Sequence, residues 1–173
     1  MTNEELERAI TRNAYEVAHA LLERQVLFSI EQHSLMPGLY VTAENFITIA
    51  NRAIFNDMVA HAIKVLDFNE DSATFWAIQK EVPEKVENLR SYSQAKIELL
   101  QELAAKLKQV RDKTHFHIDK KAVVNPRDIW SQAGIQGDEL YQGLTYLWGM
   151  LRELHNVVCG RDFRDVVGEY NGR

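Results

Sequence analysis

Apolar residues recur at intervals of three and four along most of the chain, a pattern that predicts amphipathic α-helices. Only three prolines and eight glycines occur, and most of them fall between the periodic segments. We therefore expect one all-α domain over residues 1–173, an up-and-down helical bundle of about five to six helices. Residues 161–173 mix charged and apolar side chains and are expected to form a loosely docked tail.

The pattern in the first half of the chain predicts three helices. The first is expected to follow Asn3 as its N-cap and to end before Met36-Pro37-Gly38. The second is expected to follow Thr42 and to stop at 67–71, and a short third helix is expected to start at Ser72. The apolar faces of the first two, expected to be buried, are Leu6, Ile10, Ala14, Val17, Leu21 and Phe28, then Phe46, Ile49, Ala53, Val59, Ile63 and Leu66.

The pattern in the second half of the chain predicts two longer helices. Pro83 suits the first turn of a helix that meets no breaker until about His117, although residues 91–93 could bend or divide it. The last helix is expected to follow Asp138 as its cap and to end toward Gly160. Their apolar stripes are Leu100, Leu103, Leu107 and Val110, then Leu140, Leu144, Leu147, Leu151 and Leu154.

Composition narrows the class of protein. A single cysteine, Cys159, excludes an intramolecular disulfide, and the acidic start of the chain is unlike a secretory signal. No apolar run approaches the roughly 20 residues that cross a bilayer. We therefore expect a cytoplasmic protein without membrane contact. The net charge of -5 argues against coating nucleic acid through overall charge, and DNA is not expected as a partner.

The most informative run is residues 111–119, Arg-Asp-Lys-Thr-His-Phe-His-Ile-Asp, where the long helical pattern ends. Arginine binds phosphate in a bidentate manner and histidine titrates near neutral pH, a combination suited to phosphodiester chemistry. The alternative is a helix end that carries ordinary solvated charges. The run lies in a basic patch made of Lys106, Lys108, Arg111, Lys113, Lys120, Lys121 and Arg127.

Spacing alone does not single out the catalytic pair. Arg12 and His19 form a similar pair inside an amphipathic helix, without the basic surroundings of the later run. On a continuous helix Arg111 and His115 lie about 40° apart, whereas Arg111 and His117 lie about 120° apart. Helix geometry therefore favours His115, and His117 lies on the apolar stripe, where a packed histidine is the alternative.

The run 111–119, followed by Trp130 and a last amphipathic helix, resembles the HEPN superfamily (higher eukaryotes and prokaryotes nucleotide-binding), and most of all its phage abortive-infection branch. The resemblance spans residues 5–157 in helix order, and its specific part is the motif. It implies a homodimer in which two motifs face each other, acting as a metal-independent endoribonuclease in defence or as a toxin with an antitoxin protein. It implies no cofactor.

Carried onto this chain, the resemblance implies that His117 activates an RNA 2′-hydroxyl and that Arg111 stabilises the charge on the phosphoryl oxygens. Because the family allows a longer spacing between its arginine and histidine, His117 is the first candidate for the catalytic base and His115 the second. The implied residues are Arg111, His117 and His115 for catalysis, Lys113, Lys120 and Lys121 for RNA binding, and Asp112 and Asp119 as supports of the motif.

Two other functions remain open. A catalytically inactive helical module that binds a protein or a nucleotide is favoured by the acidic charge and by Asp112, where the family often has asparagine. A metal-binding helical bundle is the third, because histidine and carboxylate suit zinc or iron. Such a site needs further inward carboxylates that the sequence does not locate, so no metal ligand is assigned. The groupings considered are His115 with His117 and Asp119, Glu16 with His19, and Asp112 with His115.

Overall fold

The computed structural model describes residues 1–34, 41–69, 71–112 and 131–163. Helix is the regular structure throughout these ranges, so the all-α prediction is confirmed. The helices are α1 (Asn3–Ser34), α2 (Val41–Leu66), α3 (Phe75–Glu81), α4 (Pro83–Glu87), α5 (Gln94–Val110) and α7 (Gly137–Cys159). None of them is both long and apolar enough to cross a membrane.

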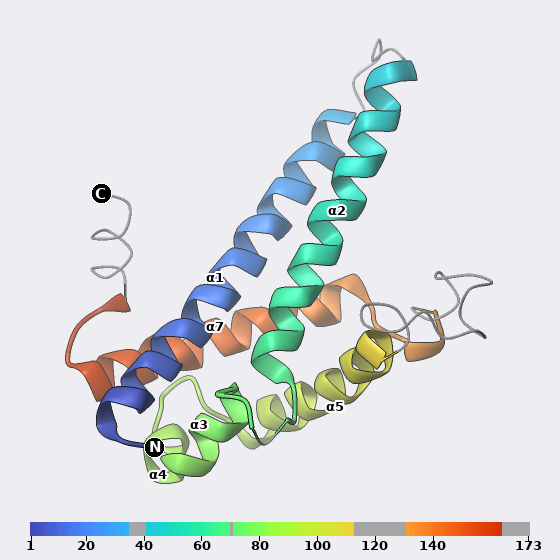
Figure 1. Ribbon diagram of the computed structural model, residues 1–173. Coiled ribbons are helices and arrows are strands. Elements are labelled where there is room, and N and C mark those ends of the chain that lie inside the picture. Colours follow the sequence, from blue (N-terminus) through green and yellow to red (C-terminus); the bar gives the residue numbers. More distant parts are fainter. Residues whose placement is uncertain (35–40, 70, 113–130, 164–173) are drawn as a thin grey trace.

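The bundle is built on a long hairpin of α1 and α2, which run side by side (Figure 1). Helix α7 packs against α1, α5 packs against α2, and both lie across the lower half of the hairpin. The short helices α3 and α4 lie at the base, beside the N-terminus. The upper half of the hairpin therefore extends beyond the helices that cover its lower half.

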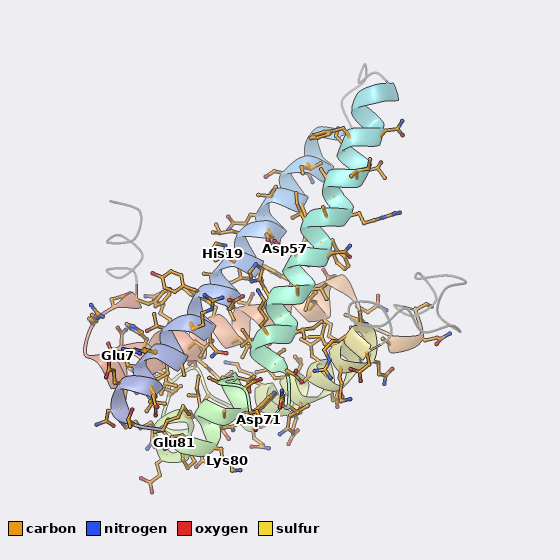
Figure 2. The ribbon with its side chains drawn as sticks, viewed as in Figure 1. Glu7, His19, Asp57, Asp71, Lys80 and Glu81 are labelled. Carbon is orange, nitrogen blue, oxygen red and sulfur yellow. The ribbon has the colours of Figure 1, made fainter. Side chains whose placement is uncertain are left out.

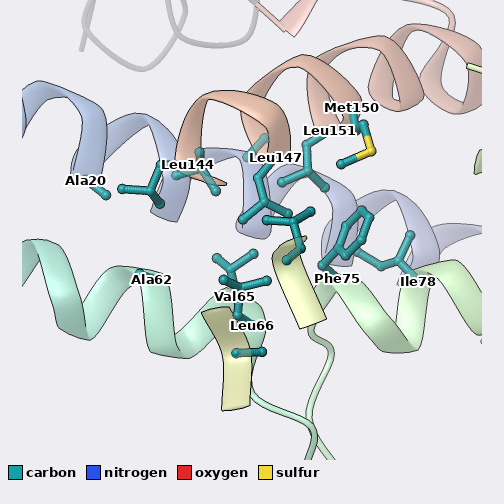
Figure 3. Packing of buried hydrophobic residues seen from close by; sticks show 14 of the residues in the cluster. Ala20, Ala62, Val65, Leu66, Phe75, Ile78, Leu144, Leu147, Met150 and Leu151 are labelled. Carbon is teal, nitrogen blue, oxygen red and sulfur yellow. The ribbon is translucent and has the colours of Figure 1, made fainter. Parts of the chain in front are cut away.

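The core lies where α1, α2, α3, α5 and α7 meet. Figure 3 shows side chains from these helices in one cluster, among them Leu66, Phe75 and Leu147, which are fully buried. Complete burial of such a side chain stabilises the fold by about 1.5–3 kcal/mol. The stripes predicted for α5 and α7 are confirmed, since all their members are buried: Leu100, Leu103, Leu107 and Val110, then Leu140, Leu144, Leu147, Leu151 and Leu154.

Two helix starts differ from the prediction because another residue provides the cap. The N-cap of α1 is Thr2 rather than Asn3: the Thr2 amide donates to Glu5 Oε2 at 2.7 Å, and the Glu5 amide donates to Thr2 Oγ1 at 3.2 Å. This reciprocal pair is a capping box. Helix α3 begins at Phe75 rather than at Ser72, and Thr74 is its N-cap.

Two further boundaries differ in the middle of the chain. Helix α2 begins at Val41, before the predicted cap Thr42. The long helix predicted from Pro83 is divided into α4 and α5, because Ser93 caps a new helix by accepting the Lys96 amide at 3.3 Å. The serine-rich segment therefore divides the helix instead of bending it.

The boundaries of α7 depend on its flanking residues. Gln136 is its N-cap in place of Asp138, and the Glu139 side chain completes a capping box with it. Gly160 ends the helix as predicted, with a φ of +69°, in the left-handed region that glycine adopts without steric cost.

Part of the apolar face predicted for the hairpin is not buried. Phe28 of α1 is 53% exposed, and Phe46 and Ile49 of α2 are 72% and 69% exposed. Leu22 and Val26 of α1 are exposed as well, so all five side chains belong to the two hairpin helices. We call these five side chains the outer hairpin residues. The periodic pattern identified the apolar face but not what covers it.

The chain after α7 returns to the core at Phe163, which is fully buried. Its ring packs edge-on against Tyr15 of α1 and against Trp148 and His155 of α7, with centroid distances of 5.0, 5.5 and 5.3 Å. The first part of the predicted tail is thereby held against α1 and α7.

Candidate functional site

Arg111 directly follows α5, and two carboxylates hold its guanidinium. Its Nε and one terminal nitrogen donate to Asp112 Oδ1 at 2.9 and 2.8 Å. The other terminal nitrogen donates to Asp67, the residue after α2. The Arg111 side chain is only 21% exposed. Arg111 therefore joins the C-terminal ends of α2 and α5 and has a fixed orientation.

The charges around Arg111 balance one another. The hydrogen bonds to Asp112, together with the nearby Asp67 carboxylate, raise the pKa of Arg111, so the guanidinium stays charged. Lys108 donates to Asp112 Oδ2 at 2.7 Å, and this bond and those from Arg111 hold the pKa of Asp112 below its ordinary value. The two cations, Arg111 and Lys108, and the two anions, Asp67 and Asp112, have a net charge of zero. Arg111 is consequently a directed hydrogen-bond donor rather than a source of net positive charge.

The rest of the predicted motif lies outside the described residues. This applies to His115 and His117, to Lys113, Lys120 and Lys121, and to Asp119. Of the predicted site residues, the structure brings together Arg111 and Asp112, and it adds Asp67, which the sequence did not single out.

A second polar cluster lies at the middle of the hairpin, where α1 faces α2. Glu16 is buried there, with a side chain only 7% exposed, and three cationic or imidazole groups surround it. Arg12 lies 2.5 Å from Glu16 Oε1, whereas His61 Nδ1 and Lys64 Nζ lie 2.5 and 3.1 Å from Oε2. Burial acts to raise the pKa of Glu16, but the hydrogen bonds with His61 and Lys64 outweigh it and hold the pKa below its ordinary value.

The other ring nitrogen of His61 faces two more carboxylates. His61 Nε2 lies 3.8 Å from Glu23 Oε1 and 3.9 Å from Asp57 Oδ2. Burial, assisted by Asp57 close by, raises the pKa of Glu23 to about 7. Glu16, Glu23, Asp57 and His61 are called the hairpin cluster below. Its members could hold a metal ion through Glu23, Asp57 and His61.

The hairpin cluster borders an open groove of about 910 Å³, lined by residues of α1 and α2 that include Glu16, His19, His61 and Lys64. Figure 2 shows His19 on α1 and Asp57 on α2 at the middle of the hairpin. The exposed His19 ring stacks on His61 with a centroid distance of 5.5 Å. The groove gives solvent molecules and ions a path to Glu16 and His61.

Sequence reasoning found only part of the hairpin cluster. It noted Glu16 with His19 as a metal-type spacing, but the structure pairs Glu16 with His61 of the neighbouring helix. Glu23, Asp57 and His61 were missed. The available signal was the four-residue spacing of Asp57 and His61, which places both on one face of α2. Their approach to Glu23 depends on helix pairing, which periodicity does not give.

Comparison with protein-family models, with curated proteins and with solved structures finds no match for this chain. The functional argument therefore rests on the residues and their geometry.

Proposed function

We propose that this protein is a HEPN-like, metal-independent endoribonuclease that acts in defence or as a toxin. The observation that carries the proposal is the fixed guanidinium of Arg111, held by Asp67 and Asp112 at the end of α5. The histidine-containing run 113–119 follows it directly in the chain. An arginine that stabilises phosphoryl charge and a histidine that transfers protons are together able to cleave an RNA phosphodiester.

Arg111 has hydrogen-bonding capacity beyond its two carboxylate partners. A guanidinium carries five N–H donors. The bonds to Asp67 and Asp112 use three of them, so two have no partner among the residues that the structure describes. Two donors in a rigid plane match two oxygens of a phosphoryl group. Because the carboxylates already fix the side chain, little rotamer entropy would be lost when the phosphate binds.

In the proposed reaction His117 acts as general base and removes the proton from an RNA 2′-hydroxyl. The resulting oxygen attacks the adjacent phosphorus, and the bond from phosphorus to the 5′-oxygen breaks. Arg111 stabilises the negative charge on the phosphoryl oxygens. A second His117, from the partner subunit, donates a proton to the leaving 5′-oxygen. The products are a 2′,3′-cyclic phosphate and a 5′-hydroxyl.

The partners of this reaction follow from its chemistry. Because the charges around Arg111 cancel, attraction of the RNA backbone is assigned to Lys113, Lys120 and Lys121. The second subunit is a copy of this chain, and the outer hairpin residues supply an apolar surface for such contact. An antitoxin protein would be a further partner, and action on cellular RNA would place the protein in the cytoplasm.

A second candidate function has its own support. The two carboxylates on Arg111 also suit a purely structural role, in which the guanidinium ties α2 to α5. In that case the protein is an inactive helical interaction or nucleotide-binding module. RNA cleavage separates the two candidates.

The decisive experiment measures RNA cleavage by the purified full chain in the presence of a chelator. We expect His117→Ala to lower the rate by about 10²–10⁴, as loss of a general base does. Arg111→Lys keeps the charge but loses the planar pair of donors, so we expect a large loss there too. His115→Ala should have the smaller effect.

Matched controls are Arg52→Ala and His19→Ala, which change an exposed arginine of α2 and an exposed histidine of α1. Both should cleave RNA as the wild type does. Cleavage unaffected by Arg111→Lys and His117→Ala would remove the assignment. No cleavage by the wild type would favour the inactive module, and cleavage abolished by the chelator would contradict a metal-independent reaction.

A further inference from the structure

We propose that Glu23, Asp57 and His61 form a binding site for a first-row divalent transition-metal ion that joins α1 to α2. This site is separate from Arg111. Asp57 of α2 lies ten residues before Asp67, the residue that follows α2 and binds Arg111, which corresponds to about 15 Å along a helix axis. The inference therefore does not depend on the proposed ribonuclease activity.

The spacing of the three side chains fits one shared ion. One ligand atom from each of Glu23, Asp57 and His61 lies within 4.8 Å of the others. His61 Nε2 is 3.8 Å from Glu23 Oε1 and 3.9 Å from Asp57 Oδ2. Bonds of about 2.0–2.2 Å to nitrogen and oxygen place two ligand atoms of one ion about 3–3.5 Å apart. A small inward movement of the carboxylates would complete the coordination.

His61 already has the orientation that a metal ligand needs. Its Nδ1 lies 2.5 Å from Glu16 Oε2, so the ring is fixed with Nε2 directed toward Glu23 and Asp57. A carboxylate on the far nitrogen of a metal-binding histidine is the usual arrangement, because it fixes the ring and raises its basicity. Arg12 and Lys64 both form ion pairs with buried Glu16, which keep its carboxylate charged and fixed, so Glu16 acts as a positioning residue.

The local electrostatics also favour a cation. Among the described residues, the ion pairs of Glu23 and Asp57 are with His61 alone, so no lysine or arginine lies within 4.0 Å of either carboxylate. Glu23 Oε2 is buried and has no hydrogen-bond partner in the described part of the chain. A buried carboxylate oxygen without a partner is unfavourable, and a metal ion would satisfy it.

The ligand types select the class of ion. One imidazole and two carboxylates suit Zn²⁺, Fe²⁺ or Mn²⁺, whereas Mg²⁺ and Ca²⁺ prefer oxygen ligands alone. The Asp57 side chain is exposed to solvent, so water can provide the remaining ligands. Such an ion would connect the two helices of the hairpin at the middle of their length.

The test is isothermal titration calorimetry of the full chain, treated with chelator and then titrated with ZnCl₂ and with MnCl₂. We expect Asp57→Asn and Glu23→Gln each to weaken binding at least about tenfold. The matched controls are Asp71→Asn and Glu87→Gln, which make the same chemical changes at exposed positions outside the cluster. They should bind as the wild type does. Because Asp57 is exposed, Asp57→Asn tests the site without altering the core.

A second readout locates the ion. Mn²⁺ is paramagnetic, so it should broaden the NMR signals of the His61 ring before those of the other histidines. Glu16→Gln should lower the Zn²⁺ affinity about tenfold. The melting temperature of the metal-free variant, measured separately, shows whether the substitution also changes the stability of the fold. The proposal is overturned if the wild type takes up neither ion, if Asp57→Asn and Glu23→Gln bind as tightly as the controls, or if Mn²⁺ broadens other histidines and leaves His61 unchanged.

Discussion

Single carboxylates organise several parts of this molecule, and Glu153 of α7 is a clear case. Its Oε1 accepts the Arg90 amide at 2.7 Å, and its Oε2 accepts the amide and the hydroxyl of Ser91 at 3.0 and 2.7 Å. Partial burial acts to raise the pKa of Glu153, but these hydrogen bonds outweigh it and hold the pKa below its ordinary value. One side chain thus fixes the turn between α4 and α5 against α7.

We predict that Glu153→Gln lowers the free energy of unfolding by about 1–3 kcal/mol at neutral pH, because hydrogen bonds to a charged acceptor are lost or weakened. A lowered pKa in the folded state means that this stabilisation is present above the ordinary glutamate pKa. It is lost as the pH falls through the folded-state pKa. The difference from the wild type should therefore shrink in acid.

Urea unfolding of wild type and variant at neutral and acidic pH measures this difference. Glu102→Gln, at an exposed position of α5, is the matched control and should be neutral. Equal stability of Glu153→Gln and wild type at neutral pH would contradict the prediction.

At the scale of single residues, the sequence predicted which residues matter better than which residues they contact. Arg111 and Asp112 were singled out from their pattern, and they do form an ion pair. Asp67 and His61 were not, because their partners come from other helices. Contacts between residues more than 40 positions apart depend on how helices pair, and the local pattern does not contain that information.

At the scale of elements, α5 and α7 approach closely at Gly143. A Cβ atom added there would lie 2.5 Å from Leu103 Cδ2 and 3.5 Å from Leu100 Cδ2, and both leucines are fully buried. At Gly149, six residues along the same helix, the nearest atom would be Ser91 Cβ at an ordinary 3.6 Å. The absence of a side chain at Gly143 is therefore what allows α5 to approach.

We predict opposite effects for the two glycines. Gly149→Ala should raise the free energy of unfolding by up to about 1 kcal/mol, because alanine has the higher helix propensity. Gly143→Ala should lower it by about 1–2 kcal/mol, because the buried leucines must leave their preferred rotamers. Each glycine is the control for the other in chemical denaturation. Equal stabilisation by both changes would show that Leu103 moves aside freely.

Helix type and the core faces of α5 and α7 were predictable from the sequence, whereas the positions of helix ends were less so. The leucines of α5 and α7 repeat without interruption, and every predicted position is buried. Thr2 replaces Asn3 as the N-cap of α1, because the two hydrogen bonds that it exchanges with Glu5 outweigh the cap preference of Asn3. Which of two neighbouring residues caps a helix depends on the hydrogen-bond geometry of the folded chain, and the residue types alone do not determine it.

At the scale of the whole molecule, the hairpin is longer than the body that covers it (Figure 1). Phe46 and Ile49 were predicted to be buried, but in the single chain they are among the most exposed apolar side chains described. Exposed apolar residues gathered on one part of a protein are typical of a contact surface. A second copy of the chain is the partner that the proposed reaction requires.

We therefore predict that the protein is a dimer in solution and that Phe46→Ser with Ile49→Ser makes it monomeric. These side chains are exposed in the single chain, so the fold of each monomer should persist. Sedimentation velocity over a range of protein concentrations measures the change. Val157→Ser, an exposed apolar position on α7, is the matched control and should remain dimeric. A monomeric wild type at every concentration would exclude this contact.

The burial of Phe163 fixes a lower limit on the length of chain that can fold. Its ring fills a space bordered by Tyr15, Trp148 and His155, so a chain shortened before residue 163 would leave those three rings without their common neighbour. Removing a buried phenylalanine costs about 3–5 kcal/mol, a large part of the total stability of a domain of this size. A truncated chain made for laboratory study should therefore extend at least through Phe163.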